Sequence, residues 1–97
     1  MEINREVSNE KLEKYFQITG EALKMAKSAE KDKSRIKEAE DFLDMASRYY
    51  SDAKHFKDKG DFVLAFAALN YAHGWLDSGA RIELFKVKDS RLFTVDD

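Results

Sequence analysis

The chain of 97 residues contains no cysteine and no proline, and it has only four glycines. Without cysteine it cannot form disulfides, thiolate metal sites or a cysteine nucleophile. Sandwiches and barrels of many strands draw on glycine and proline for their frequent turns, so the shortage of both argues against an all-β fold. Long helices joined by few turns are expected instead.

Other absences limit the possible functions. The net charge of -2 gives no excess of positive charge with which a general nucleic-acid-binding protein would displace counterions. No uncharged apolar run approaches the roughly 18 residues that span a bilayer. The amino terminus carries charges of both signs and lacks the apolar segment of a signal peptide. We therefore expect a cytoplasmic protein that does not enter a membrane and is not a general nucleic-acid-binding protein.

What the sequence does contain is 37% charged and 43% hydrophobic residues, a balance typical of amphipathic helices with charged outer faces. Apolar residues recur at steps of three and four over three stretches, which predicts helices at about 9–29, 34–58 and 62–85. Short connections favour antiparallel neighbours. We predict a single domain over 1–97, an all-α, up-down-up three-helix bundle, with a flexible tail at 87–97 whose apolar patch docks back or meets a partner.

The boundary between the second and third helices carries the clearest local signal. Lys57 and Lys59 lie where the helix dipole is negative, Gly60 suits the left-handed position after a helix, and Asp61 can cap the next helix. This pattern predicts a helical hairpin with a very short turn.

The third helix is apolar nearly all round, and two neighbouring helices rarely cover both apolar faces of a third. This surplus predicts that the helix contacts a protein partner or a second copy, as in a homodimer. The remaining narrow strip is small or polar, and Gly74 within it is expected to let another backbone come close. The candidate ligand- or partner-binding residues on and beside this strip are Asn70, His73, Trp75, Asp77 and Arg81. The same polar residues could instead fix the register of a helix contact.

Catalytic motifs are scarce. The chain has no Glu-x-x-His pair of a di-iron bundle and no Gly-x-Ser-x-Gly turn, so we expect no metal and no cofactor. One pattern remains, because Arg48 and His55 match the Arg-x(4–6)-His spacing of the all-α ribonucleases called HEPN and could stabilise a cleaved phosphate. Pairing of Arg48 with Asp44 and Asp52, four residues away on either side, explains that arginine equally well.

The stretch 49–62, which reads Tyr-Tyr-Ser-Asp-Ala-Lys-His-Phe-Lys-Asp-Lys-Gly-Asp-Phe, and its continuation over 65–81 resemble one family. This is the family of short archaeal proteins grouped as domain of unknown function 357. The resemblance implies an archaeal source and a compact helical fold, and it implies no activity. The sequence thus favours a non-enzymatic interaction or self-association module, with a HEPN-like RNA-processing or toxin-type ribonuclease as the alternative.

Overall fold

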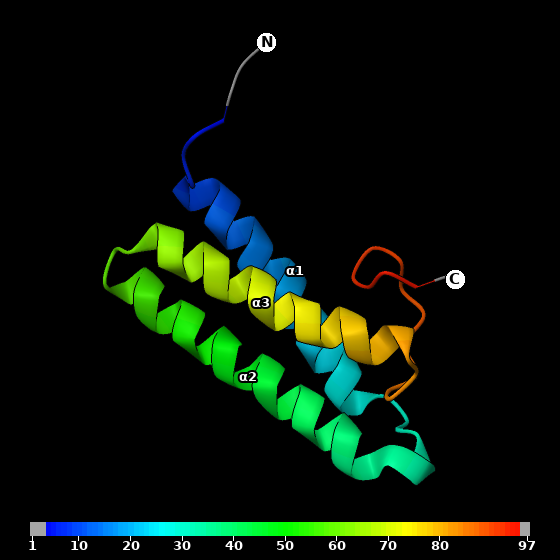
Figure 1. Ribbon diagram of the computed structural model, residues 1–97. Coiled ribbons are helices and arrows are strands. Elements are labelled where there is room, and N and C mark those ends of the chain that lie inside the picture. Colours follow the sequence, from blue (N-terminus) through cyan, green and yellow to red (C-terminus); the bar gives the residue numbers. More distant parts are fainter. Residues whose placement is uncertain (1–3, 96–97) are drawn as a thin grey trace.

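The structure is a computed structural model that describes residues 4–95. It contains the helices α1 (Asn9–Ser28), α2 (Ile36–Asp58) and α3 (Phe62–Arg81), with a short 3-10 helix, η1 (Lys33–Arg35), before α2. The prediction of an all-α bundle of three helices is confirmed (Figure 1).

Two of the helices begin at side-chain caps. The Ser8 side chain accepts a hydrogen bond from the Lys11 amide at 3.0 Å, and the Asp61 carboxylate accepts one from the Leu64 amide at 3.1 Å. First-turn amides have no partner within their own helix, so a short oxygen-bearing side chain placed before the helix stabilises its start. These caps fix the starts of α1 and α3.

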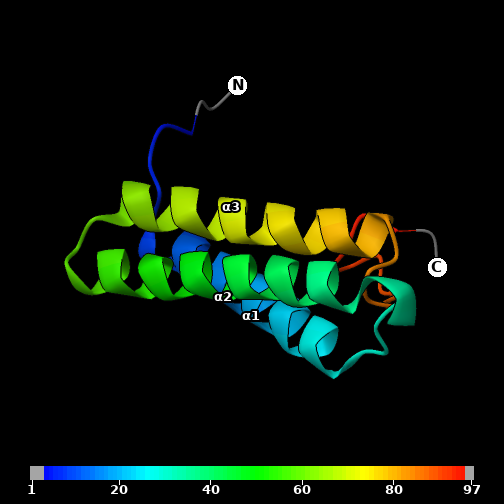
Figure 2. The same ribbon diagram turned by 60° about the horizontal axis from the view of Figure 1, so that its bottom comes forward.

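The end of α2 is closed by backbone hydrogen bonds around Gly60. The Gly60 amide donates to the Lys57 carbonyl and the Asp61 amide donates to the Phe56 carbonyl, both at 2.9 Å. This is the Schellman arrangement, which needs a left-handed residue, and Gly60 has a φ of 80°. The turn is therefore tight, and α2 and α3 run antiparallel side by side (Figure 2).

The end of α3 differs from the prediction, because the helix stops at Arg81 and does not continue to residue 85. The Glu83 amide donates to the Ala80 carbonyl at 3.1 Å, and the Leu84 amide donates to the Gly79 carbonyl at 2.8 Å. This is a second Schellman arrangement, with Glu83 in the left-handed position at a φ of 59°. Glutamate gives no sequence signal for such a turn, since glycine or asparagine usually fills it.

The segment after α3 packs against the bundle, whereas the sequence predicted a flexible tail at 87–97. The Lys86 amide donates to the Glu30 carbonyl, and the Asp32 amide donates to the Leu84 carbonyl, both at 2.9 Å. These bonds join the segment to the connection between α1 and α2. Its buried apolar side chains are Leu84, Phe85, Val87, Leu92 and Phe93. The patch thus docks back, as one of the two expected outcomes; residues 96 and 97 of the expected tail lie outside the described part.

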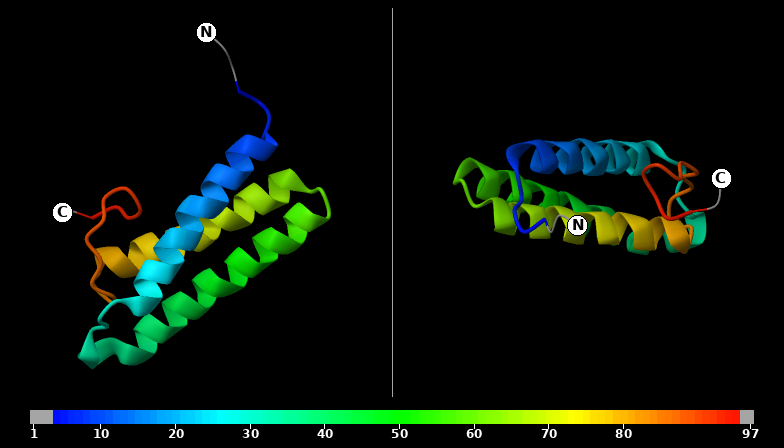
Figure 3. Two further views of the ribbon diagram at one scale, coloured as in Figure 1. Left: turned by 180° about the vertical axis from the view of Figure 1, so that it is seen from behind. Right: turned by 90° about the horizontal axis from the view of Figure 1, so that it is seen from above.

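The helices form two layers, with α2 and α3 side by side in one and α1 lying obliquely across that pair in the other (Figure 3). The molecule is correspondingly flat, with principal extents of 44 × 30 × 16 Å. Within residues 4–95, α1 covers one face of the α2–α3 hairpin, and no helix covers the other. We call this uncovered side the open face. Its exposed residues on α3 are Val63, Leu64, Ala67, Asn70, Tyr71, Gly74, Ser78 and Arg81.

Candidate functional site

Four aromatic rings form a row between α2 and α3. The ring of Phe42 meets that of Trp75 at 5.0 Å, the Trp75 and Tyr71 rings lie 6.3 Å apart, and Tyr71 meets Tyr49 at 4.4 Å. All three pairs are edge-to-face, an arrangement that adds about 0.5–1.5 kcal/mol per pair to the burial of the rings. The row holds the hairpin together, yet Tyr71 remains 51% exposed at its surface.

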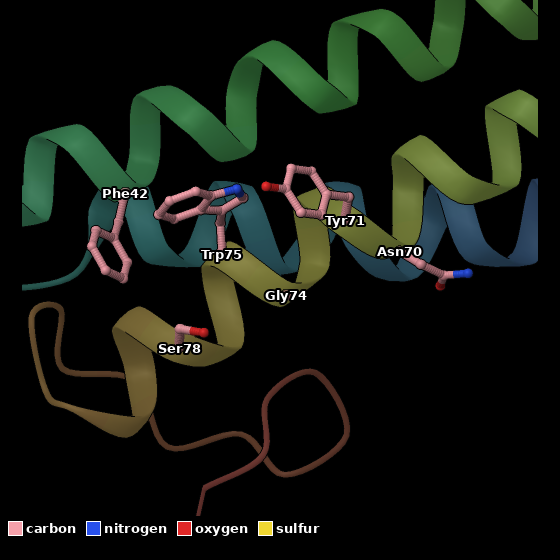
Figure 4. A pocket seen from close by; sticks show the side chains of 6 residues that line it. All are labelled: Phe42, Asn70, Tyr71, Gly74, Trp75 and Ser78. Carbon is pink, nitrogen blue, oxygen red and sulfur yellow. The ribbon is translucent and has the colours of Figure 1, made fainter.

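A shallow hollow of about 340 Å³ lies over this row (Figure 4). Its aromatic lining comes from both helices of the hairpin, and its small and polar lining comes from α3 alone. The indole nitrogen of Trp75 is buried here and has no hydrogen-bond partner among the described residues. A buried N–H donor without an acceptor costs about 1–3 kcal/mol. The residues that line the hollow are Phe42, Asn70, Tyr71, Gly74, Trp75 and Ser78.

His73 lies on the other side of α3 and ties it to α1 and to the C-terminal segment. Its Nε2 lies 2.6 Å from the Leu92 carbonyl oxygen, and its Nδ1 lies 3.0 Å from the hydroxyl of the buried Thr19. Because a carbonyl oxygen can only accept, Nε2 carries a hydrogen and donates it. Both ring nitrogens are therefore engaged within the chain, which identifies His73 as a structural side chain at this junction.

Asp77 reinforces the same junction one turn further along α3. Its two carboxylate oxygens accept hydrogen bonds from the Thr94 amide at 2.8 Å and from the Thr94 hydroxyl at 3.3 Å. Asp77 and Arg81 are four residues apart, a spacing that suits an ion pair on a helix, but the two side chains do not pair in the structure. We call the side of α3 that carries His73 and Asp77 the closed side.

The structure thus divides the predicted site residues into two groups. His73 and Asp77 point to the closed side, whereas Asn70 and Arg81 are exposed on the open face and Trp75 lies in the aromatic row. Asn70 borders hollows on both sides of α3, since it also lines a smaller one of about 260 Å³ next to α1. No single pocket contains all five residues.

The expectation for Gly74 is wrong within the described chain. A Cβ atom added at this glycine would meet no described atom within 4 Å, so no other backbone of residues 4–95 comes close to it. Gly74 lines the hollow over the aromatic row and also the smaller hollow next to α1, so open space lies beside it. The glycine therefore has no packing reason within the described chain.

Three residues that shape the open face were not among the predicted site residues: Phe42, Tyr49 and Ser78. Phe42 and Tyr49 are seven residues apart, which places them on one side of α2, so their common direction was visible in the sequence. The sequence did not indicate that no helix would cover the side of the hairpin that these two residues border. Whether this side is covered depends on which face of the hairpin α1 packs against.

The alternative catalytic pair lies on the outside of α2. Arg48 and His55 are both exposed, and the Arg48 Nε atom donates to the Asp44 carboxylate at 2.9 Å. The predicted Asp44–Arg48 pair is therefore confirmed, whereas a pair between Arg48 and Asp52 is not formed. The His55 ring lies against that of Phe56, with 6.1 Å between their centroids.

The connection before α2 holds a carboxylate with a strongly shifted pKa. Hydrogen bonds from the Ser34 hydroxyl and amide, with a further one from Arg35, lower the pKa of Asp32 to about 2. The same Arg35 donates to the Ile82 carbonyl at 2.6 Å. Asp32 thus orders the strand-like connection onto which the segment after α3 packs.

Residues 4–95 hold no group of three or more His, Asp or Glu side chains placed to bind a metal ion. Among the same residues, no helix has the length and apolarity needed to cross a bilayer.

The family model described as "Protein of unknown function (DUF357)" matches residues 14–85, and the chain belongs to this family. Neither the curated proteins nor the solved structures that were compared gave a match.

Proposed function

We propose that this member of the DUF357 family is a non-enzymatic protein-interaction module, and that its binding surface is the open face. The observation that carries the proposal is the half-exposed Tyr71 ring at the edge of the apolar hollow. Apolar surface exposed to water costs free energy, and a partner that covers this face would remove that cost.

The distribution of charge supports the same surface. Charged residues occur in nearly every turn of α1 and α2, whereas α3 carries only Asp77 and Arg81, and Asp77 is bound to Thr94. Protein interfaces are depleted in charge at their centre and enriched in aromatic residues and arginine. The part of the open face that α3 contributes has this composition, with Tyr71 and Trp75 near its middle and Arg81 at its end.

Its shape suggests that the partner presents a helix. The open face follows α3 from Val63 to Arg81, a run of about 27 Å at 1.5 Å per residue. Its hollow is lined by Phe42 of α2 and otherwise by residues of α3. Amphipathic helices bind apolar depressions of this kind with apolar anchors every three or four residues.

Position-specific crosslinking tests this proposal. A photoreactive phenylalanine derivative replaces Asn70 on the open face or, as the matched control, Gln17 on the exposed side of α1, and both variants are irradiated in a native cell extract. We expect discrete adducts from position 70 that excess unlabelled protein competes away, and none from position 17. Equal adducts from both positions, or none from position 70, would contradict the proposal.

The HEPN-like ribonuclease remains the alternative, and the Asp44–Arg48 ion pair argues against it because the guanidinium already has a partner. The variant Arg48→Ala with His55→Ala tests it directly. If the wild-type chain cleaves RNA and the double variant does not, the enzyme alternative replaces the interaction module. The cytoplasmic location and archaeal source remain predictions.

A further inference from the structure

We infer that the partner of the open face is a second copy of this chain, bound with its α3 antiparallel to the first about a two-fold axis level with residue 72. The inference rests on the proposed function, because it names the occupant of the same surface. Three features of α3 support it: its charge distribution, its small residues and the position of Tyr71.

The distribution of charge along α3 favours a second copy as the partner and an antiparallel orientation of the two helices. From Phe62 to Leu76, about four turns, α3 has no charged residue, so two copies can face each other without opposing like charges. Asp61 caps one end of α3 and Arg81 lies at the other. A parallel pair of helices would place Arg81 beside the second chain's Arg81 and Asp61 beside its Asp61, so like charges would meet. An antiparallel pair instead places Arg81 at the end that carries Asp61 of the second chain.

Arg81 is available for this contact. It is exposed, and no other described residue forms a hydrogen bond or an ion pair with it. With the axis level with residue 72, Arg81 lies opposite Val63 of the second copy, which is 70% exposed. The apolar stem of the arginine can cover this valine while its guanidinium reaches Asp61, two residues further along.

The small residues allow the two helices to approach closely. Glycine inside a helix costs about 1 kcal/mol relative to alanine, and nothing in the described chain uses the space beside Gly74. Ala67 and Ser78 continue the small surface one to two turns away on the same face. The distance between packed helix axes, typically 8–10 Å, is set by the side chains at the contact, so this stripe permits the short end of that range.

The same register places complementary groups near the axis. Asn70 of each copy lies opposite Gly74 of the other, where its amide enters the space that any larger residue would fill. Tyr71 lies next to the axis, so its half-exposed ring and the hollow beside it are covered by the second copy. One self-complementary contact thus accounts for the exposed tyrosine, the glycine and the arginine that has no partner among residues 4–95.

Sedimentation of the purified full-length chain tests the inference. We expect a species of about twice the monomer mass of 11.2 kDa at micromolar concentration. Gly74→Leu should weaken the dimer at least about tenfold without harming the fold, since the monomer leaves open space at this position. Gln17→Leu on α1, the matched control, should leave the association unchanged. A wild-type monomer up to several hundred micromolar, or a dimer that Gly74→Leu leaves intact, would overturn it.

Disulfide trapping tests the direction, because the chain has no cysteine of its own. Ala67→Cys and Ser78→Cys chains are mixed and oxidised. The antiparallel pair predicts mainly mixed disulfides between the two variants; a preference for like with like would overturn the proposed arrangement. A purified chain that stays monomeric while position 70 still crosslinks to another protein would refute this inference alone and leave the interaction module standing.

Discussion

The two sides of α3 carry similar kinds of residue and have opposite environments. On the closed side, His73 and Asp77 bind Thr19, Leu92 and Thr94, so each polar group has a partner from another segment. On the open face, the polar side chains Asn70, Ser78 and Arg81 recur at similar helical spacing and form no side-chain hydrogen bond with the described residues. A polar residue on a helix is thus structural or available according to what packs on it, and its spacing alone does not distinguish the two.

The largest difference between the sides should appear at their aromatic rings. Phe85 is fully buried where the closed side meets the C-terminal segment, so Phe85→Ala should cost about 3–5 kcal/mol in the free energy of unfolding. Tyr71→Ala on the open face should cost less, because half of that ring is already in water. Urea denaturation at low protein concentration measures both values. Equal losses would show that the two sides are not packed differently.

The two glycines of α3 should respond with opposite signs. An added Cβ at Gly79 would overlap the Phe85 ring, so Gly79→Ala should destabilise the fold by about 1–3 kcal/mol. Gly74→Ala meets open space and should stabilise the helix by up to about 1 kcal/mol. Thermal unfolding of dilute protein measures whether each substitution raises or lowers the stability. A loss of stability at Gly74 would mean that part of the chain packs against the open face.

Removing the histidine should loosen the C-terminal segment more than the helix. His73→Phe leaves the Leu92 carbonyl and the Thr19 hydroxyl without their partner, at a cost of about 1–3 kcal/mol. Hydrogen exchange at residues 92–94 should accelerate, while exchange in the centre of α2 changes little. The matched variant Asn70→Ala, one turn earlier on the open face, should alter stability by no more than about 0.5 kcal/mol. Unchanged exchange at 92–94 would refute the role assigned to His73.

The smallest expected effect is a pH dependence of the stability that comes from Asp32, in the connection between α1 and α2. The folded pKa of Asp32 is lowered to about 2, so the folded chain keeps this carboxylate ionised where the unfolded chain binds a proton. The stability it contributes is therefore present above about pH 4 and is lost as the pH falls from 4 to 2. The stability difference between wild type and Asp32→Asn should shrink over that range. A constant difference from pH 5 to 2 would contradict the assigned pKa.

The ends of α2 and α3 show how far the sequence could predict the fold. Both helices end in the same arrangement of backbone hydrogen bonds, but the first has Gly60 in the left-handed position and the second has Glu83. The end of α2 was predictable from the sequence, because glycine readily adopts the left-handed conformation that this turn requires. Glu83 adopts its φ of 59° where Leu84 and Phe85 beyond it are buried against α1 and α2, and that burial depends on distant residues.

The candidate site was predictable in part for the same reason. Helical spacing correctly indicated that α3 has more apolar surface than two neighbours can cover, and it drew attention to the stretch from Asn70 to Arg81. It could not separate Asp77 from Asn70 and Arg81, because Thr94, which binds Asp77, lies 17 residues away in the sequence. It also could not show that Phe42 of α2 would complete the hollow.

The sequence by itself determined the three helices, the caps at Ser8 and Asp61 and the turn at Gly60, because each follows from hydrogen bonds and apolar periodicity within a few residues. Only the tertiary structure decided which side of α3 is closed and which is open. That choice depends on α1 crossing one face of the hairpin and on the C-terminal segment folding back onto the same end. Both are contacts between segments distant in the chain, and their free energy comes from apolar burial that no local pattern specifies.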